Sequence, residues 1–271
     1  MTLQTAPQQG RKLLDDAGIS APRLTAEVLL AHAIGQPRSW LYAHSDDELK
    51  EVWWIHYGRY LHQRTQGIPT QYITGTQEFF GRNFRVAPSV LIPRPETEHV
   101  VETALKHHAE TILDIGTGSG AIAITLALET KASVFGTDIS PEALKIAMQN
   151  AAVLEARVGF VECDLGSALR DGSFDLVVSN PPYVPESDHA TLQREVRDHE
   201  PALALFAGAD GLAIYSRLIP DAARLLKPGG RLILELGYTS LEPVRGMLEG
   251  WRTIEVVEDL AHIPRVLSAS V

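Results

Sequence analysis

The sequence lacks the features that mark membrane-spanning, secreted and disulfide-stabilised proteins. Its single cysteine, Cys163, has no partner within the chain, as is typical of proteins from a reducing compartment. No apolar run reaches the roughly 18 residues that a membrane-spanning helix needs. The first residues, MTLQTAPQQGRK, have no apolar core of the kind found in signal peptides. We therefore expect a cytoplasmic protein without a membrane partner.

Basic charge is scarce as well. The chain has 24 Lys and Arg against 34 Asp and Glu, which gives a net charge of −10. Residues 1–75 are balanced, with seven residues of each sign, so residues 76–271 hold the whole acidic excess. A domain that grips a phosphate backbone usually shows a basic stripe, and none is visible here. The ten histidines show no metal-ligand spacing. We expect no direct nucleic-acid partner and no metal site.

Residues 1–75 have the pattern of a small helical domain. Apolar residues recur at helical spacing in RKLLDDAG, APRLTAEVLLAHAIG and DDELKEVWWIHYGRYLHQRTQG. Ser45 and Glu48 have capping-box spacing and predict that a helix begins at Ser45. The segments end at glycines, which are typical of helix C-termini, namely Gly18, Gly35 and Gly67. We expect a helical bundle over 1–75.

Residues 76–95 change character. Two short apolar and aromatic runs flank Gly81-Arg82-Asn83, which predicts a β-hairpin. Pro93-Arg94-Pro95 then breaks the chain, and a helical pattern resumes over 96–108. We expect a hairpin linker over 76–95, followed by a second domain over 96–271.

From Thr111 onward, strands and helices alternate, which is typical of a parallel sheet covered on both faces. Ligands in such sheets bind beyond the carboxyl ends of the strands. The expected strands are 111–116, 132–139, 157–164, 174–180, 231–237, 252–259 and 265–270. The expected helices between them are 120–129, 141–153, 211–226 and 240–249. The sequence thus predicts an α/β fold with a seven-stranded, Rossmann-like sheet.

A glycine-rich motif, Asp114–Gly120 (DIGTGSG), lies between the end of the first of these expected strands and the beginning of a helix. Glycines let the backbone turn tightly and approach a ligand. The next strand ends at Asp138, whose carboxylate is placed to accept both ribose hydroxyls of a nucleoside. The segment from Gly116 to Ala121 also satisfies the dinucleotide pattern. Asp114, inside the strand, favours a cationic amino acid or sulfonium over a pyrophosphate.

The sharpest signal is Asn180-Pro181-Pro182-Tyr183, which directly follows a strand. The two prolines have fixed φ, and each pushes the preceding residue toward extended geometry. Such a segment offers two acceptors, the Asn180 side-chain oxygen and the Pro181 carbonyl, to one NH₂ group. Accepting both hydrogens turns the lone pair of an unreactive amide or aryl amine toward an electrophile and stabilises the charge that develops. Tyr183 would pack against the planar group and hold it in register.

Together these motifs resemble class I S-adenosylmethionine-dependent methyltransferases that act on nitrogen. More of the chain is similar to one branch, the PrmC/HemK family of protein-(glutamine-N5) methyltransferases of peptide-chain release factors. The resemblance runs from about residue 10 to the end and rests on the segments PTQYITG from Pro69, EFFG from Glu78, LIPRPETE from Leu91, and HEP from His199 with GADGL from Gly208.

The resemblance implies S-adenosylmethionine as cofactor and the Gly-Gly-Gln loop of class-one release factors as substrate. It also implies an N-terminal helical domain for substrate recognition, and we expect the chain to act as a monomer. In relatives the residue after Asp164 is often aromatic, so Leu165 would place adenine on an aliphatic side chain. The implied cofactor-binding residues are Asp114, Gly116, Thr117, Gly118, Ser119, Gly120, Asp138, Ile139, Asp164, Leu165 and Asn180. The implied catalytic and substrate-binding residues are Asn180, Pro181, Pro182 and Tyr183.

Two alternatives stay open at this point. An N6-adenine or N2-guanine methyltransferase would use the same Asn-Pro-Pro-Tyr chemistry on a base of DNA or RNA, although it would also need to flip the base and hold the strand. A nucleotide- or dinucleotide-binding sensor would use the glycine-rich turn without any role for Asn180.

Overall fold

The computed structural model describes residues 1–271, and its contacts divide the chain into two compact units. The first unit contains Met1–Thr76 and Gln193–His199, and the second contains Gln77–Leu192 and Glu200–Val271. No helix of the chain combines the length and the apolar character needed to cross a membrane.

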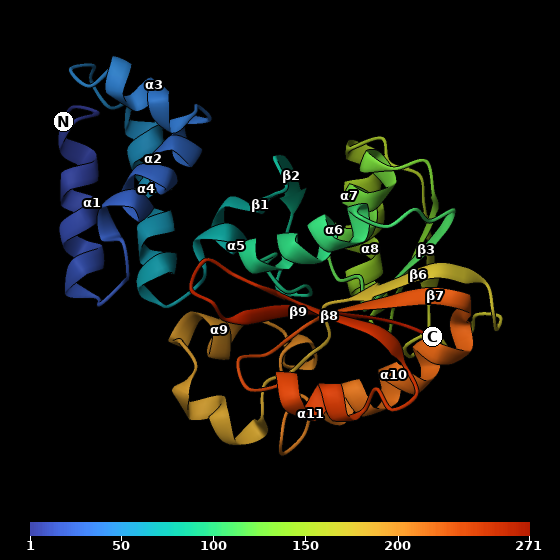
Figure 1. The fold of residues 1–271 in the computed structure, drawn as a ribbon. Coiled ribbons are helices and arrows are strands. Elements are labelled where there is room, and N and C mark those ends of the chain that lie inside the picture. Colours follow the sequence, from blue (N-terminus) through green and yellow to red (C-terminus); the bar gives the residue numbers. More distant parts are fainter. The chain divides into compact units, whose positions relative to one another are not determined.

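The first unit is a bundle of helices around a core of leucine, alanine and tyrosine side chains, and its α1–α4 run from blue to teal in Figure 1. Gly10 lets α1 approach α4 closely, because a Cβ at this position would lie 1.9 Å from the Tyr57 hydroxyl. Its helices are α1 (Thr5–Asp16), α2 (Pro22–Ile34), α3 (Arg38–Ala43), α4 (Glu51–Thr65), α5 (Thr70–Thr74) and α9 (Arg194–His199).

The expected helix start at Ser45 is wrong. Helix α4 begins at Glu51, and its N-cap is Lys50. The Ser45 carbonyl instead accepts a hydrogen bond from the Gln4 backbone N–H at 2.9 Å, in a stretch where residues 45–49 pair with the first residues of the chain. A contact that is distant in sequence therefore overrides the local capping signal.

Helix α9 lies in residues 96–271, which we expected to form the second domain, but it packs within the first unit. The buried guanidinium of Arg64 on α4 pairs with Glu195 on α9. Arg194 adds a hydrogen bond of 3.1 Å to the Gln66 carbonyl. The chain therefore enters the first unit twice, once at its start and once between residues 193 and 199.

The second unit is built on a seven-stranded sheet with the order β5-β4-β3-β6-β7-β9-β8 (Figure 1). Most positions of its central strands β3, β6 and β7 are buried, as expected for strands covered on both faces. The strands are β3 (Thr111–Ile115), β4 (Ser133–Asp138), β5 (Val158–Glu162), β6 (Phe174–Ser179), β7 (Leu226–Glu235), β8 (Arg252–Glu258) and β9 (Pro264–Ser270).

One strand departs from the expected parallel sheet. Strand β9 inserts between β7 and β8 and runs antiparallel to both. Only the short stretch 259–263 separates β8 from β9, and a parallel crossover needs a longer connection. The Asp259 carboxylate stabilises this turn, since it accepts from the backbone N–H groups of Ala261 and Ile263 at 2.8 and 3.0 Å.

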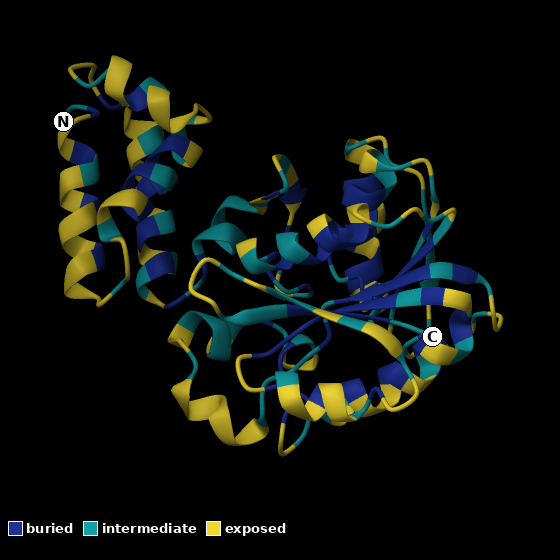
Figure 2. Cartoon of the chain, in the orientation of Figure 1, coloured by how far each residue is buried: buried dark blue, intermediate teal, exposed yellow.

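Helices cover both faces of the sheet. Side chains of α6, α7 and α8 pack in one buried cluster, and those of α10 and α11 pack in another on the opposite face (Figure 1). In Figure 2 the central strands are dark blue, while α10 alternates between buried and exposed positions. The α-helices are α6 (Glu98–Leu105), α7 (Ala121–Glu129), α8 (Pro141–Val153), α10 (Ala213–Leu225) and α11 (Leu241–Gly246). Short 3-10 helices are η1 (Pro95–Thr97), η2 (Glu186–Thr191) and η3 (Ala202–Ala204).

The predicted hairpin is present as β1 (Thr76–Phe79) and β2 (Arg82–Arg85). Phe79 and Phe84 are buried and pack edge to face at 6.0 Å in the same cluster as α6 and α7. The side chain of Asn150 on α8 bonds both backbone groups of Arg85. From Gln77 on, the hairpin therefore belongs to the second unit.

Candidate active site

The glycine-rich turn joins β3 to α7 at the carboxyl edge of the sheet. The Gly116 and Thr117 N–H groups both donate to the Thr137 carbonyl at 2.8 Å, which ties the turn to the end of β4. Gly120 is the N-cap of α7 with a φ of 81°, and a Cβ there would lie 2.7 Å from the Ile124 side chain. Only glycine meets both requirements, because L side chains rarely adopt this φ.

Asp138 ends β4 beside this turn. Its two carboxylate oxygens accept from the Gly118 N–H at 2.9 Å and the Ser140 N–H at 3.0 Å. Burial raises the pKa of Asp138, and these backbone donors oppose that shift. Each carboxylate oxygen has a further lone pair, so the group keeps acceptor capacity for a ligand.

Asp114 is fully buried inside β3 and does not line the cavity. One carboxylate oxygen accepts from the Thr117 hydroxyl at 2.7 Å and the Ala123 N–H at 3.2 Å, while the other has no partner. Burial raises the pKa of Asp114 to about 7. Its contacts hold the turn to the first residues of α7.

Asp164 and Leu165 lie just beyond the end of β5, where the expected strand had continued to residue 164. The Asp164 carboxylate pairs with Arg217 of α10 at 2.5 Å, and both side chains are about half exposed. Leu165 has a φ of 52°, an uncommon conformation for a branched residue. Both residues line the cavity.

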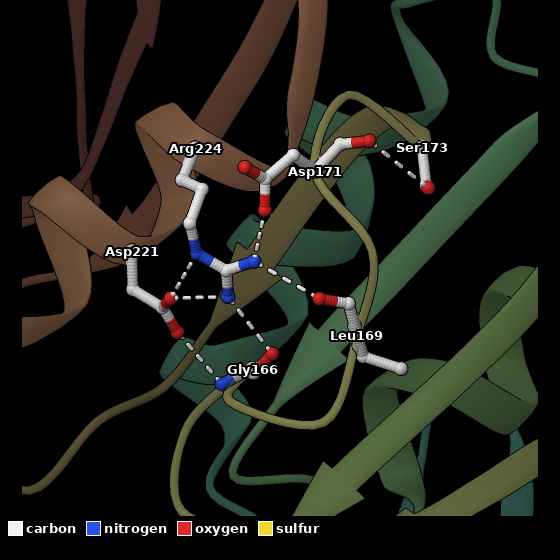
Figure 3. Close-up of polar contacts among 6 residues, drawn as sticks. All are labelled: Gly166, Leu169, Asp171, Ser173, Asp221 and Arg224. Atoms are coloured by element: carbon white, nitrogen blue, oxygen red, sulfur yellow. Dashed lines mark hydrogen bonds and ion pairs between the residues drawn. The ribbon is translucent and has the colours of Figure 1, made fainter.

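Arg224 near the end of α10 fixes the loop that follows these two residues (Figure 3). Its guanidinium donates to the carbonyls of Gly166 and Leu169 at 3.0 and 2.9 Å and pairs with Asp171. Asp221 completes the set, because it pairs with Arg224 and accepts from the Gly166 N–H at 2.7 Å. The conformation of the loop is thus set by hydrogen bonds and ion pairs among five residues of one helix and one loop.

Asn180 follows β6 and is half-buried at the cavity. Its NH₂ group donates to the Thr97 hydroxyl at 3.1 Å. The Tyr183 hydroxyl donates to the buried Glu235 Oε1 at 3.4 Å. Burial raises the pKa of Glu235 to about 7, against the lowering effect of the nearby Thr97 and Tyr183 hydroxyls.

Tyr183 is packed tightly between two glycine-containing segments. A Cβ on Gly211 would lie 2.4 Å from the Tyr183 carbonyl oxygen, and a Cβ on Gly237 would lie 2.9 Å from the tyrosine ring. The close backbone approach requires glycine at both positions. The Pro-Pro-Tyr segment is therefore held from both sides.

These elements surround one cavity of about 240 Å³, within the second unit. It brings together most of the residues that the motifs had singled out. Those that line it are Gly116, Thr117, Gly118, Ser119, Asp138, Ile139, Asp164, Leu165, Asn180 and Pro182. Asp114, Gly120, Pro181 and Tyr183 are not among the lining residues.

Sequence reasoning missed several lining residues, most of which come from segments without a chemical motif. They are Ser89, Val90, Leu91, Pro93, Thr97, Ser140, Ala143, Cys163, Pro201, Leu203, Ala204, Ile214 and Arg217, together with Ile115, Ala121 and Ile122. The two prolines around Arg94 were a signal of rigid placement. Arg94 pairs with the buried carboxylate of Glu200, which also accepts from the Ile92 N–H at 3.4 Å. This clamp holds the segment before α6 against the start of η3.

Two family models match the chain. Residues 5–75 match the PrmC N-terminal domain, and residues 106–257 match a methyltransferase domain.

Curated relatives match almost the full length of the chain. A release factor glutamine methyltransferase of Koribacter versatilis is 46% identical over 98% of this chain and 98% of its own. Proteins of the same name from Geobacter sulfurreducens and Moorella thermoacetica are 43% and 42% identical, over 96% and 99% of this chain and 94% and 98% of theirs.

Solved methyltransferase structures share the fold. A methyltransferase from Pyrococcus furiosus has a TM-score of 0.55 at 20% identity and covers 71% of this chain and 90% of its own. The hMettl16 catalytic domain has a TM-score of 0.58 at 19% identity, over 78% of this chain and 80% of its own. The predicted Rossmann-like methyltransferase fold is confirmed.

Proposed function

Because the chain belongs to the family of release factor glutamine methyltransferases, as its motifs predicted, we propose that it methylates the side-chain amide nitrogen, N5, of a glutamine in a peptide-chain release factor. S-adenosylmethionine is the methyl donor. The observation that carries the proposal is the Asn180 amide, whose NH₂ group is bonded to Thr97 at the cavity. That bond leaves the amide oxygen as an acceptor for a substrate amide.

The cavity has the groups that S-adenosylmethionine requires. The remaining lone pairs of Asp138 suit the two ribose hydroxyls, since its other contacts are single backbone N–H groups. The turn Gly116–Ser119 presents backbone to the methionine and ribose end. The apolar side chains of Ile139 and Leu165 lie with Asp164 where adenine would rest. When bound, the cofactor supplies a methyl group on a positively charged sulfur.

The Asn180–Tyr183 segment would prepare the substrate glutamine. An amide nitrogen is a poor nucleophile because its lone pair is delocalised. The Asn180 oxygen and the Pro181 carbonyl would accept its two hydrogens, turn the lone pair toward the methyl group and stabilise the developing charge. Tyr183, anchored on Glu235, would hold the segment in register. No strong general base is required, since the methylated amide loses its proton readily after transfer.

The finer assignment of the substrate is the glutamine of the Gly-Gly-Gln loop of class-one release factors. We assign the first unit to holding the release factor, because its charge is balanced and residues 5–75 match a domain specific to this family. The chain would act as a monomer on a protein substrate, without direct contact to nucleic acid.

Methyl transfer in vitro tests the proposal. Purified protein and radiolabelled S-adenosylmethionine are offered an intact release factor, the same factor with the loop glutamine changed to alanine, and bulk DNA and RNA. We expect label on the intact factor only. Label on both factors would place the reaction at another residue. Label on nucleic acid and none on the factor would replace the proposal by an N6-adenine or N2-guanine methyltransferase.

A further inference from the structure

A buried carboxyl group joins two segments that line the cavity. Glu200 is the first residue of the second unit after α9, and its side chain is 1% exposed. One of its oxygens pairs with the Arg94 guanidinium, and the other accepts from the Ile92 backbone N–H at 3.4 Å. Glu200 thus holds the segment before η1 at two points, although 106 positions separate it from Arg94 in the sequence.

The segment that Glu200 holds is stiff. Pro93 and Pro95 flank Arg94, and the ring of each proline fixes its own φ and restricts the residue before it. The Arg94 carbonyl accepts from the Thr97 N–H at 3.1 Å, which closes the single turn of η1. A displacement of Arg94 therefore moves Thr97 as well.

Thr97 is the residue of this segment that contacts the Asn-Pro-Pro-Tyr motif. Its hydroxyl accepts from the Asn180 NH₂ group at 3.1 Å, and both residues line the cavity. The proposed role of Asn180 requires that its amide oxygen meet the substrate, and this bond engages the opposite end of the amide. Because a hydrogen bond weakens steeply when its geometry changes, the amide stays in place only while Thr97 does.

We propose that Arg94 and Glu200 are positioning residues for methyl transfer, an inference that rests on the proposed function. Their ion pair holds η1, and through Thr97 it keeps the Asn180 amide where a substrate glutamine can meet it. The burial of Glu200 supports this role. A buried charge loses its hydration, and apolar side chains in place of a buried ion pair are often no less stable. Bonds to two defined atoms fix the position of a segment, which apolar contacts do not.

Steady-state methylation of a release factor by single variants tests the first step. Arg94→Met removes the charge and keeps an apolar stem. We expect kcat to fall by about 10- to 100-fold, the scale on which misplacement of a reacting group acts. Glu200→Gln replaces the charged partner of Arg94 by a neutral amide of the same shape and should lower kcat as well. The dissociation constant for S-adenosylmethionine, measured by calorimetry, should keep its wild-type value.

A double variant tests whether the ion pair acts through the Asn180 amide. Once Asn180→Ala has removed that amide, Arg94→Met should lower kcat no further, because residues that act through one group are not additive. A purely structural role of the ion pair would lower kcat by the same factor in both backgrounds. Single-turnover measurements with enzyme in excess give the slow rates. Glu200→Gln provides the same comparison if Arg94→Met does not fold, which urea unfolding shows.

Arg82→Met is the matched control. Arg82 also pairs with a glutamate of the second unit, Glu129, and its side chain is 27% exposed against 33% for Arg94. Neither Arg82 nor Glu129 lines the cavity. Arg82→Met should therefore have the wild-type kcat.

The outcomes are distinct. Wild-type kcat in both Arg94→Met and Glu200→Gln would overturn the inference while the proposed function stands. An undiminished effect of Arg94→Met in the Asn180→Ala background, or an equal loss in Arg82→Met, would also overturn it. A wild-type enzyme that labels no release factor would overturn the proposed function and this inference with it.

Discussion

Buried carboxylates in the two units are stabilised in opposite ways. Glu27 on α2 is 6% exposed and bonds Arg23 at 3.0 Å, Arg38 at 2.9 Å and the Tyr42 hydroxyl at 2.6 Å. Burial alone would raise the pKa of Glu27, but these three donors outweigh it and the pKa is lowered. In the second unit, burial raises the pKa of Asp114 and Glu235 to about 7.

The difference lies in the donors. Glu27 has two guanidinium partners, whereas the hydrogen bonds of Asp114 and Glu235 come from neutral hydroxyl and backbone groups. Each of the latter two also has one oxygen without a partner. A carboxylate paired with cations has its negative charge compensated. A carboxyl group that accepts only from neutral donors has no such compensation, and burial therefore raises its pKa. The first arrangement joins α2 to α3 in the helical unit, whereas the second leaves both carboxyl groups buried with raised pKa values.

The largest effect is expected at Asn180, whose side chain lies at the cavity of the second unit. Asn180→Ala removes an acceptor that acts in the transition state, so kcat should fall by about 10²- to 10³-fold, as for other preorganised polar groups. Affinity for S-adenosylmethionine should change little. Steady-state kinetics and calorimetry measure the two quantities. Asn83→Ala, at an exposed hairpin position, is the matched control. Near-normal turnover in Asn180→Ala would refute its role.

The next effect is expected at Asp138, which neutral backbone donors also hold. Asp138→Ala should raise the dissociation constant for S-adenosylmethionine by about 10- to 100-fold, since hydrogen bonds to a charged group are strong. Calorimetry measures it directly. Asp16→Ala, an exposed residue at the end of α1, should have no effect. Unchanged affinity in Asp138→Ala would rule out the ribose contact.

The pH dependence of stability should have opposite signs for Glu235 and Glu27. The folded pKa of Glu235 is raised to about 7, so its ionisation destabilises the fold as pH rises from about 4.5 through 7. Glu235→Gln should therefore be more favourable to stability at pH 8 than at pH 5. The groups around this carboxylate are Thr97, Tyr183, Glu96 and Arg265.

The folded pKa of Glu27 is lowered, so its stabilising contribution is present above the unfolded pKa and disappears as pH falls through the folded pKa. Glu27→Gln should therefore be more destabilising at pH 8 than at pH 4. Urea unfolding of both variants and wild type at each pH gives the comparison. The same sign for both glutamates would contradict the contrast between the two units.

The smallest effect is expected at a donor of Glu27. Tyr42→Phe removes one hydrogen bond to the buried carboxylate and should lower the free energy of unfolding by about 1 kcal/mol. Both arginines remain as partners, and their exposed side chains contribute modestly because water screens them. Turnover at saturating substrate should stay at the wild-type value, measured beside urea unfolding. A loss of turnover without a loss of stability would assign Tyr42 to the site.

Local patterns were sufficient for much of the second unit. The alternation of apolar strands with helices placed Asp138 at the end of β4 and Asn180 directly after β6, because period and strand length are local properties. The glycine-rich turn and the Pro-Pro segment were also found from local patterns, because glycine and proline each determine the backbone conformations available at their own position. The capping signal at Ser45 failed because pairing with the chain's first residues competes with it.

The sequence alone thus predicted the fold class, and it singled out the two motifs that the structure brings to one cavity at the edge of the sheet. It contained no signal that the Tyr183 hydroxyl reaches the buried Glu235, that Glu200 clamps Arg94, or that α9 joins the first unit. Those contacts join residues far apart in the chain, and they arise only when sheet, loops and helices pack together. Motif chemistry depends on residue type and spacing, whereas the orientation of a side chain depends on which distant neighbours fill its surroundings.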